Sequence, residues 1–149
     1  MTRTNAREIA VHLVYEMNFH AVTAGEALEA MLQEDYYPSL KTESDVYEEK
    51  PSGRQLEYIT ALVMGVQDRS EELDAAISRL SVGWRLERIS RVARAIMQVA
   101  MYECRYVEDV PVSAAINEAV ELTRKYEDED VVSFVNGILG GFAREADAQ

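Results

Sequence analysis

Hydrophobic residues recur at intervals of three and four over most of the chain, which is the spacing of one face of an α-helix. Residues 5–19 show this spacing first, and Asn5 with Glu8 has the pattern of a capping box at a helix start. Thr23 and Glu26 repeat that pattern before the next periodic segment. No segment alternates between apolar and polar residues with a period of two. The pattern therefore predicts helices and no sheet.

The same periodicity returns in six further segments. They span residues 24–34, 52–66, 73–80, 88–106, 111–126 and 128–142. Residues 88–106 are apolar around most of a helical circumference, which is typical of a helix at the centre of a bundle. We expect an all-α fold of about seven helices in a single domain that spans residues 1–149.

Residues 34–53 interrupt the helical pattern. They contain Pro38, Pro51, a cluster of acidic residues and three tyrosines. Proline removes a backbone donor and disfavours a helix interior. We expect a long acidic loop near 34–53 on the surface.

The chain is acidic, because 27 Asp and Glu residues against 15 Lys and Arg residues give a net charge of −12. Spread evenly, this charge would repel nucleic acids and anionic membranes. Positive charge is concentrated, however, in residues 79–105, which hold six arginines and two glutamates. Guanidinium groups suit phosphate recognition, so this part of the chain is a candidate for anion binding.

Composition and the absence of known motifs also argue against several classes of protein. The one cysteine, Cys104, excludes an intramolecular disulfide and favours a reducing cytoplasm. No apolar run reaches the roughly 20 residues of a membrane span. The sequence contains no phosphate-binding glycine loop, dinucleotide-binding fingerprint or G-x-S-x-G motif. We therefore expect no membrane partner, no cofactor and no enzymatic activity.

Two features resemble chemical sites. Glu8, His12, Glu16 and His20 are spaced by four along the first helix, and this spacing can bind a metal. A solvated face with alternating charge is the better explanation, because no further ligand can be named. Cys104 lies in an apolar helix without a histidine nearby in the sequence, which is typical of a core thiol rather than of a nucleophile.

The first helix also carries a candidate site for an anion. Arg3, Arg7, Val11 and Tyr15 are spaced by four and would lie along one face. Guanidinium groups next to a tyrosine ring suit single-stranded RNA, because they contact phosphates while the ring stacks on bases. The alternative is an ordinary amphipathic helix in which Tyr15 is half-buried. An RNA site here requires that these side chains point away from the protein interior.

Arginine recurs along the central apolar segment as well. The polar residues there are Arg85, Arg88, Arg91, Arg94, Gln98, Tyr102 and Arg105. One interpretation is a track for phosphate groups. The other is intramolecular pairing with acidic residues such as Glu71, Glu72 or Asp74, and periodicity alone favours this pairing.

Three glycines, Gly137, Gly140 and Gly141, lie inside the last predicted helix, where each costs up to about 1 kcal/mol relative to alanine. Gly137 and Gly141 are one turn apart, so we expect another helix to approach closely there. The neighbouring Asn136 is polar in an apolar run and is either a satisfied buried amide or a contact residue at an edge.

Four segments of the sequence occur together, in the same order, in one known family. They read A-R-E-I-A-V-H-L-V-Y at 6–15, L-E-R-I-S-R-V-A-R-A-I-M-Q-V-A-M-Y-E at 86–103, D-V-P-V-S-A-A-I-N-E-A-V-E-L at 109–122 and E-D-V-V-S-F-V-N-G-I-L at 129–139. Jointly they resemble the NusB family of bacterial transcription antitermination factors. The acidic segment 34–53 lies outside this resemblance.

The resemblance implies a fold of seven helices in two packed three-helix bundles and a function without catalysis. Proteins of this family bind the boxA element of nascent ribosomal RNA transcripts, which is single-stranded. They do so together with NusE, a ribosomal protein of the small subunit. The pair joins RNA polymerase and other Nus factors and suppresses premature termination.

The resemblance also implies which residues contact RNA. The family uses its N-terminal arm and first helix, and the matching residues here are Arg3, Arg7 and Tyr15. The start of the last helix also faces RNA in the family, and the matching residues are Asp130, Phe134 and Asn136.

The NusE surface of the family lies largely on the central part of the chain, where the candidates are Arg94, Gln98 and Tyr102. A second function is an acidic helical scaffold that docks a basic protein through its acidic loop and binds little RNA itself. A third is an RNA-presenting domain like the front part of some RNA methyltransferases. An acidic chain favours a basic partner, because opposite charges steer the two together.

Overall fold

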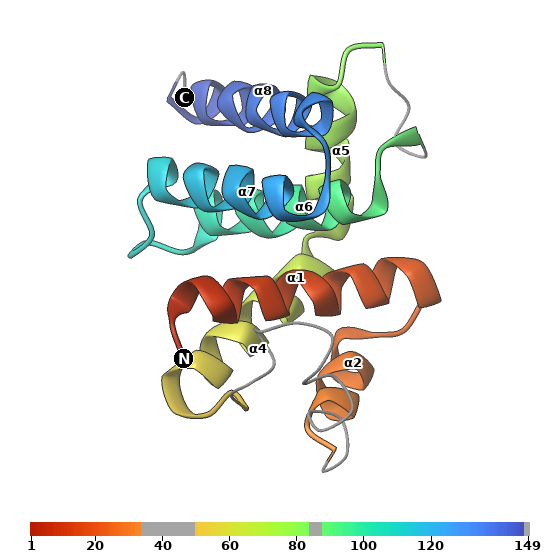
Figure 1. Cartoon of the computed structure of the whole chain (residues 1–149), viewed down its shortest axis with the longest axis vertical. Helices are drawn as coiled ribbons and strands as arrows, with labels where there is room; N and C mark the ends of the chain where they lie inside the picture. The colour runs from red at the N-terminus through yellow and green to blue at the C-terminus, as the bar shows by residue number, and fades with distance from the viewer. Residues whose placement is uncertain (34–49, 84–87, 148–149) are drawn as a thin grey trace.

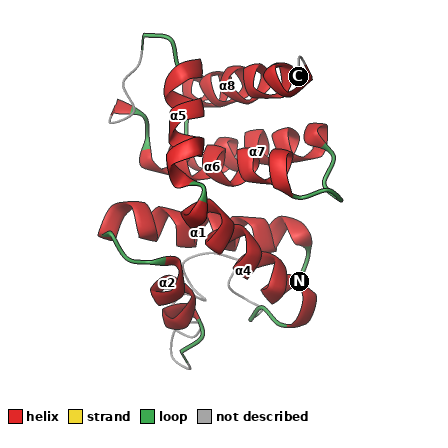
Figure 2. Ribbon diagram, turned by 180° about the vertical axis from the view of Figure 1, so that it is seen from behind, coloured by secondary structure: helices red, strands yellow, loops and turns green. Residues whose placement is uncertain are grey.

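The computed structural model describes residues 1–33, 50–83 and 88–147, and these residues contain seven helices and no strand (Figure 1, Figure 2). The helices are α1 (Arg3–His20), α2 (Ala24–Met31), α4 (Gly53–Asp68), α5 (Ser70–Leu80), α6 (Arg91–Tyr106), α7 (Val112–Tyr126) and α8 (Glu129–Asp147). The prediction of an all-α fold with about seven helices is confirmed. Most of the acidic loop expected near 34–53 lies outside the described residues.

The helices form two groups (Figure 1). α1, α2 and α4 pack against one another in the first, and α5, α6, α7 and α8 in the second. α5 follows α4 directly and contacts α4, α6 and α8, so it connects the two groups. None of the helices in the described part of the chain has the length and apolarity that crossing a bilayer requires.

Capping residues decide where the first two helices begin. The Thr2 side chain accepts a hydrogen bond from the backbone N–H of Asn5 at 3.1 Å, and α1 therefore begins at Arg3. The prediction of a capping box at Asn5 and Glu8 is wrong, because Thr2, three residues before Asn5, is the N-cap and Asn5 lies within the first turn of the helix. The box of Thr23 and Glu26 is confirmed at the start of α2, where both reciprocal hydrogen bonds form.

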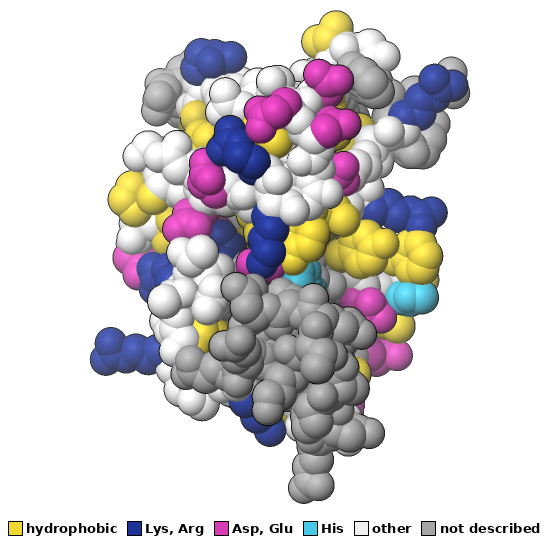
Figure 3. All heavy atoms as spheres, in the orientation of Figure 1, with side chains coloured by type: hydrophobic (Ala, Val, Ile, Leu, Met, Phe, Trp, Pro, Cys, Tyr) yellow, Lys and Arg dark blue, Asp and Glu magenta, His cyan; other side chains and the backbone are white. Residues whose placement is uncertain are grey.

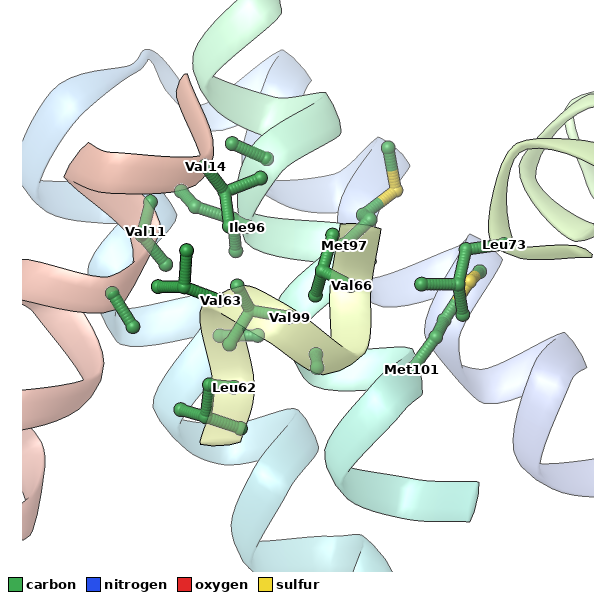
Figure 4. Close-up of a cluster of buried hydrophobic side chains, with 14 of the residues drawn as sticks. Val11, Val14, Leu62, Val63, Val66, Leu73, Ile96, Met97, Val99 and Met101 are labelled. Carbon is green, nitrogen blue, oxygen red and sulfur yellow. The ribbon is translucent and has the colours of Figure 1, made fainter. Parts of the chain in front are cut away.

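α6 lies at the centre of the fold, as its wide apolar surface predicts. It contacts five helices, namely α1, α4, α5, α7 and α8. Figure 4 shows the shared core, which includes Val11, Val14, Leu62, Val63, Val66, Leu73, Ile96, Met97, Val99 and Met101. Burying one such side chain stabilises the fold by about 1.5–3 kcal/mol, so this core holds the two bundles together.

Two glycines allow other helices to come close. A Cβ atom on Gly65 would lie 2.1 Å from Cζ of Tyr102, so only hydrogen fits between α4 and α6 there. A Cβ atom on Gly141 would lie 3.1 Å from Cδ2 of Leu80, which confirms the expected close approach of a helix. The same expectation is wrong for Gly137, where no described side chain or neighbouring helix lies within 4 Å.

Candidate nucleic-acid interface

Arg7 lies inside the protein, although the sequence suggested an exposed face of α1. The residue is 5% exposed, and its guanidinium group donates to both carboxylate oxygens of Glu103 on α6, at 2.6 and 2.8 Å. The Tyr58 hydroxyl of α4 donates to the same carboxylate. The expectation that Arg7 and Val11 point away from the interior is wrong, because α4 and α6 pack against this face of α1.

Electrostatic interactions join Arg7, Tyr58 and Glu103 into one group. Burial by itself would lower the pKa of Arg7, but the hydrogen bond and the charge of Glu103 outweigh this effect and raise the pKa. Burial and the Glu103 carboxylate raise the pKa of Tyr58, so its phenol stays protonated and donates. The group is a buried ion pair with satisfied polar atoms, and it connects α1, α4 and α6.

Arg3 is exposed at the beginning of α1 and has two partners. Its Nη1 atom lies 3.3 Å from Oδ2 of Asp109, and its guanidinium carbon lies 4.5 Å from the centre of the Tyr58 ring. The Arg3 side chain is 43% exposed, so solvent screens this ion pair. A phosphate can compete for such a guanidinium group.

Tyr15 is half-buried and forms an aromatic surface with Phe19, one turn later in α1. The two ring centres are 5.8 Å apart, and the ring planes differ by 6°. The guanidinium carbon of Arg91 lies 4.5 Å from the centre of the Phe19 ring, and Phe19 is 45% exposed. Figure 3 shows exposed hydrophobic side chains beside a basic one and a histidine at the right-hand edge, over the end of α1. Phe19 was not among the residues expected from the sequence, although its spacing from Tyr15 was a usable signal.

An apolar pocket of about 290 Å³ opens between the beginnings of α6 and α8. Its lining residues are Arg88, Ile89, Ser90, Ala93, Asp130, Val131 and Phe134. Asp130 and Phe134, both expected at an RNA surface, therefore line one pocket. Asn136 is exposed and lies outside this lining. Asp128 caps the beginning of α8, because its carboxylate accepts a hydrogen bond from the backbone N–H of Val131 at 3.3 Å. The Asp130 carboxylate therefore does not serve as the cap of this helix.

The three residues expected at a partner surface are only partly accessible. Arg94 donates to both carboxylate oxygens of Asp74 on α5, at 3.1 and 2.7 Å. Gln98 is fully buried, donates to Asp74 and accepts from Asn18. Tyr102 is half-buried. A buried amide cannot contact a docked protein, so the expectation for Gln98 is corrected: the residue connects α1, α5 and α6.

The arginines of the polar strip that the structure describes fall into two classes, while Arg85 lies outside the described residues. Arg94 pairs with Asp74, and Arg105 pairs with Glu72 at 2.6 Å, which confirms the pairing interpretation for these two. Arg88 and Arg91 are exposed, and neither forms an ion pair with any carboxylate in the described parts of the chain. The strip is therefore neutralised along most of α6 and carries available positive charge at its beginning.

The acidic and histidine ladder on α1 is partly used inside the protein. Glu8 accepts from Nζ of Lys125 at 2.7 Å and from the Tyr126 hydroxyl at 2.5 Å, and that hydroxyl lies 2.7 Å from Nε2 of His12. The described residues contain no group of three side chains that could hold a metal ion. Cys104 is half-buried, and burial raises the pKa of its thiol to about 11, as expected of a core thiol.

Comparison with known proteins identifies the family. The model of the NusB family matches residues 4–144. The transcription antitermination protein NusB of a Thermoanaerobacter species is 37% identical over 145 residues, which cover 97% of this chain and 92% of the relative. The chain belongs to the NusB family. The resemblance inferred from the four sequence segments is confirmed.

Further NusB proteins agree in sequence and in fold. The transcription antitermination protein NusB of Acetivibrio thermocellus is 39% identical over 140 residues, which cover 94% of this chain and 87% of the relative. The solved structure of T. maritima NusB has a TM-score of 0.76 and 26% sequence identity, and the match covers 97% of this chain and 92% of that one. The seven-helix arrangement is thus the NusB fold.

Proposed function

We propose that the protein is a cytoplasmic, non-enzymatic antitermination factor that binds boxA-type single-stranded RNA of nascent ribosomal RNA transcripts together with NusE. The observation that carries this proposal is the exposed arginine and aromatic surface where the end of α1 lies beside the beginning of α6, next to the pocket between α6 and α8. Arginine contacts to phosphates combined with rings for base stacking are the chemistry of single-strand binding. Membership in the NusB family supports the assignment to antitermination with RNA polymerase and the other Nus factors.

Local charge permits RNA binding by an acidic chain. At physiological salt the Debye length is about 8 Å, so carboxylates farther away than this are largely screened. A guanidinium–phosphate contact at about 4 Å contributes on the order of 1–4 kcal/mol. Few such contacts imply weak binding by the isolated chain. A basic partner such as NusE would add positive surface next to the site, and the net charge of −12 favours its approach.

The candidate RNA residues of this proposal are Arg3, Tyr15, Asp130, Phe134 and Asn136. Arg7 supports the site indirectly, by holding α1 against α6. At the partner surface, Arg94 and Tyr102 stay in the proposal because both are partly exposed. We infer that the described helices belong to one RNA-binding domain.

A second candidate function is an acidic protein-interaction scaffold with little RNA binding of its own. The observation that favours it is the state of the first helix, where Arg7 is buried and Arg3 already pairs with Asp109. The two candidates differ in what the chain binds when its basic partner is absent or present.

A mobility assay with the chain, NusE and a short boxA RNA in all combinations, at two salt concentrations, tests the proposal. We expect a weak, salt-sensitive shift with RNA alone and a stronger shift with both components. A stable complex with NusE that never retains RNA would support the scaffold and reject the RNA-binding function. An RNA of the same length with a scrambled sequence is the control for non-specific binding.

A further inference from the structure

We propose that Arg88 and Arg91, at the beginning of α6, are the principal phosphate contacts of this chain, and that Phe19 is the ring on which a base stacks. This inference rests on the proposed RNA-binding function and names the residues that perform it. The cationic residues of the site then lie where the end of α1 contacts the beginning of α6, and not at the beginning of α1 as the sequence suggested.

Positive charge that no carboxylate neutralises is unevenly distributed over the described residues. Most basic side chains in the described residues pair with a carboxylate, namely Arg3, Arg7, Arg69, Arg79, Arg94, Arg105, Arg124 and Lys125. Arg88 and Arg91 are exposed and lack such a partner in the described parts of the chain. Transferring a phosphate to them therefore breaks no ion pair of the protein.

Arg91 lies beside the aromatic side chains at the end of α1. Its guanidinium group lies over the Phe19 ring, a contact that orients the group through its flat face and leaves the N–H groups at its edge for a phosphate. Phe19 is 45% exposed and lies beside the nearly parallel Tyr15 ring. A base stacked on the part of this ring pair that Arg91 leaves exposed would place its own phosphate close to the Arg91 guanidinium group.

Arg88 lies at the pocket between α6 and α8. This residue lines the apolar pocket together with Ile89, Val131 and Phe134. The pocket, at about 290 Å³, is near the lower limit of ligand pockets, so it suits a single ring system such as one nucleobase. Ser90 lies in sequence between the two arginines and caps α6 by accepting from the backbone N–H of Ala93. Its hydroxyl also donates to Oε1 of Glu127, and this carboxylate offsets the partial positive charge of the helix N-terminus, so the charge available to a phosphate here is that of the two arginines.

These positions describe a path for a single strand. One base lies on Phe19 and Tyr15, and another enters the pocket in front of Phe134. The phosphates that connect them pass Arg91 and Arg88, which are three residues apart in sequence.

Binding of a short single-stranded boxA RNA to the full chain with NusE, measured by fluorescence anisotropy, tests the inference. We expect the double variant Arg88→Ala, Arg91→Ala to bind at least tenfold more weakly near 0.1 M salt. The slope of log affinity against log salt should fall by about 1.4, since each lost phosphate contact on a single strand contributes about 0.7. Arg54→Ala, Arg144→Ala is the matched control, because it removes two other exposed arginines and changes the net charge equally.

A second pair of variants tests the ring. Phe19→Ala should weaken binding by about tenfold, because base stacking on an aromatic side chain is lost. Met64→Ala is its control, since Met64 is another large exposed hydrophobic residue and lies on α4. All these positions are exposed, and melting curves of the variants check that each remains folded.

The outcomes separate this inference from the function on which it rests. Equal losses in the Arg88, Arg91 variant and its control would mean that only net charge matters, and would overturn the site. Unchanged affinity in the Arg88, Arg91 and Phe19 variants, with binding retained by the wild type, would also overturn the site and leave the proposed function intact. No RNA binding by the wild type, with or without NusE, would overturn both.

Discussion

The guanidinium group of Arg7 is held by both carboxylate oxygens of Glu103, a residue 96 positions later in the chain, and both side chains are buried. This pair connects the first helix of one bundle to the central helix of the other. An arginine that the sequence suggested as an RNA contact is therefore part of what positions the RNA surface. The same packing directs Tyr15 and Phe19 toward the beginning of α6, where Arg91 lies over the Phe19 ring.

Removal of Arg7 should destabilise the protein strongly. Arg7→Ala leaves the Glu103 carboxylate buried without its cation, and we expect the free energy of unfolding to fall by about 3–5 kcal/mol in urea denaturation. Arg3→Ala, which breaks the exposed pair with Asp109, should cost less than about 1 kcal/mol. Similar losses in the two variants would contradict a dominant role for burial of the Arg7 pair.

Stability should decrease in mild acid because of His12. Burial lowers the pKa of this histidine from its usual value near 6.5, against an opposing effect of Glu8 and alongside a further lowering by Lys125. As the pH falls below about 6.5, the unfolded chain binds a proton at His12 more readily than the folded chain, so the free energy of unfolding falls.

A comparison of two glutamine variants isolates this effect. His12→Gln should show a flatter dependence of unfolding free energy on pH between about 7 and 5, measured by urea denaturation at each pH. His20→Gln, which replaces the exposed histidine of the same helix, should keep the wild-type slope. Identical slopes in both variants would rule out His12 as the titrating group.

Two glycine-to-alanine substitutions should change the free energy of unfolding in opposite directions. Gly65→Ala places a methyl group against the Tyr102 ring, and we expect a loss of about 1–3 kcal/mol in unfolding free energy. Gly137→Ala adds a methyl group where nothing lies within 4 Å in the described parts of the chain, and it should stabilise α8 by up to about 1 kcal/mol. The double variant Gly65→Ala, Tyr102→Ala should lose less unfolding free energy than the two single variants lose in sum. An additive loss would show that contact with the Tyr102 ring does not cause the effect of Gly65→Ala.

Cys104 should react slowly with thiol reagents. With a pKa of about 11 in place of the ordinary 9.0, its thiolate fraction at neutral pH is about 100-fold lower than that of a free cysteine. Labelling by a chromogenic disulfide should therefore be at least that much slower in the folded protein than in urea. A labelling rate near that of the unfolded chain would show that the thiol is neither buried nor shifted.

Much of the fold follows from local patterns. The apolar periodicity predicted the helical segments, Thr23 and Glu26 predicted the beginning of α2, and the wide apolar surface of residues 88–106 predicted that α6 is central. These features depend on residues close together in sequence. Local sequence patterns predicted the candidate RNA surface less well. Arg3, Arg7, Val11 and Tyr15 share a spacing of four, but spacing says nothing about which face of a helix another helix covers.

The sequence by itself determined the all-α class, the segments that become helices, the net negative charge and the membership in the NusB family. Only the tertiary structure decided which arginines are available to a ligand. Arg7 and Arg94 are neutralised by Glu103 and Asp74, which lie on other helices, whereas Arg88 and Arg91 remain exposed beside an apolar pocket and the Phe19 ring. The reason is physical: periodicity is a property of one helix, while the burial and pairing of a charge depend on the neighbours that packing brings to it.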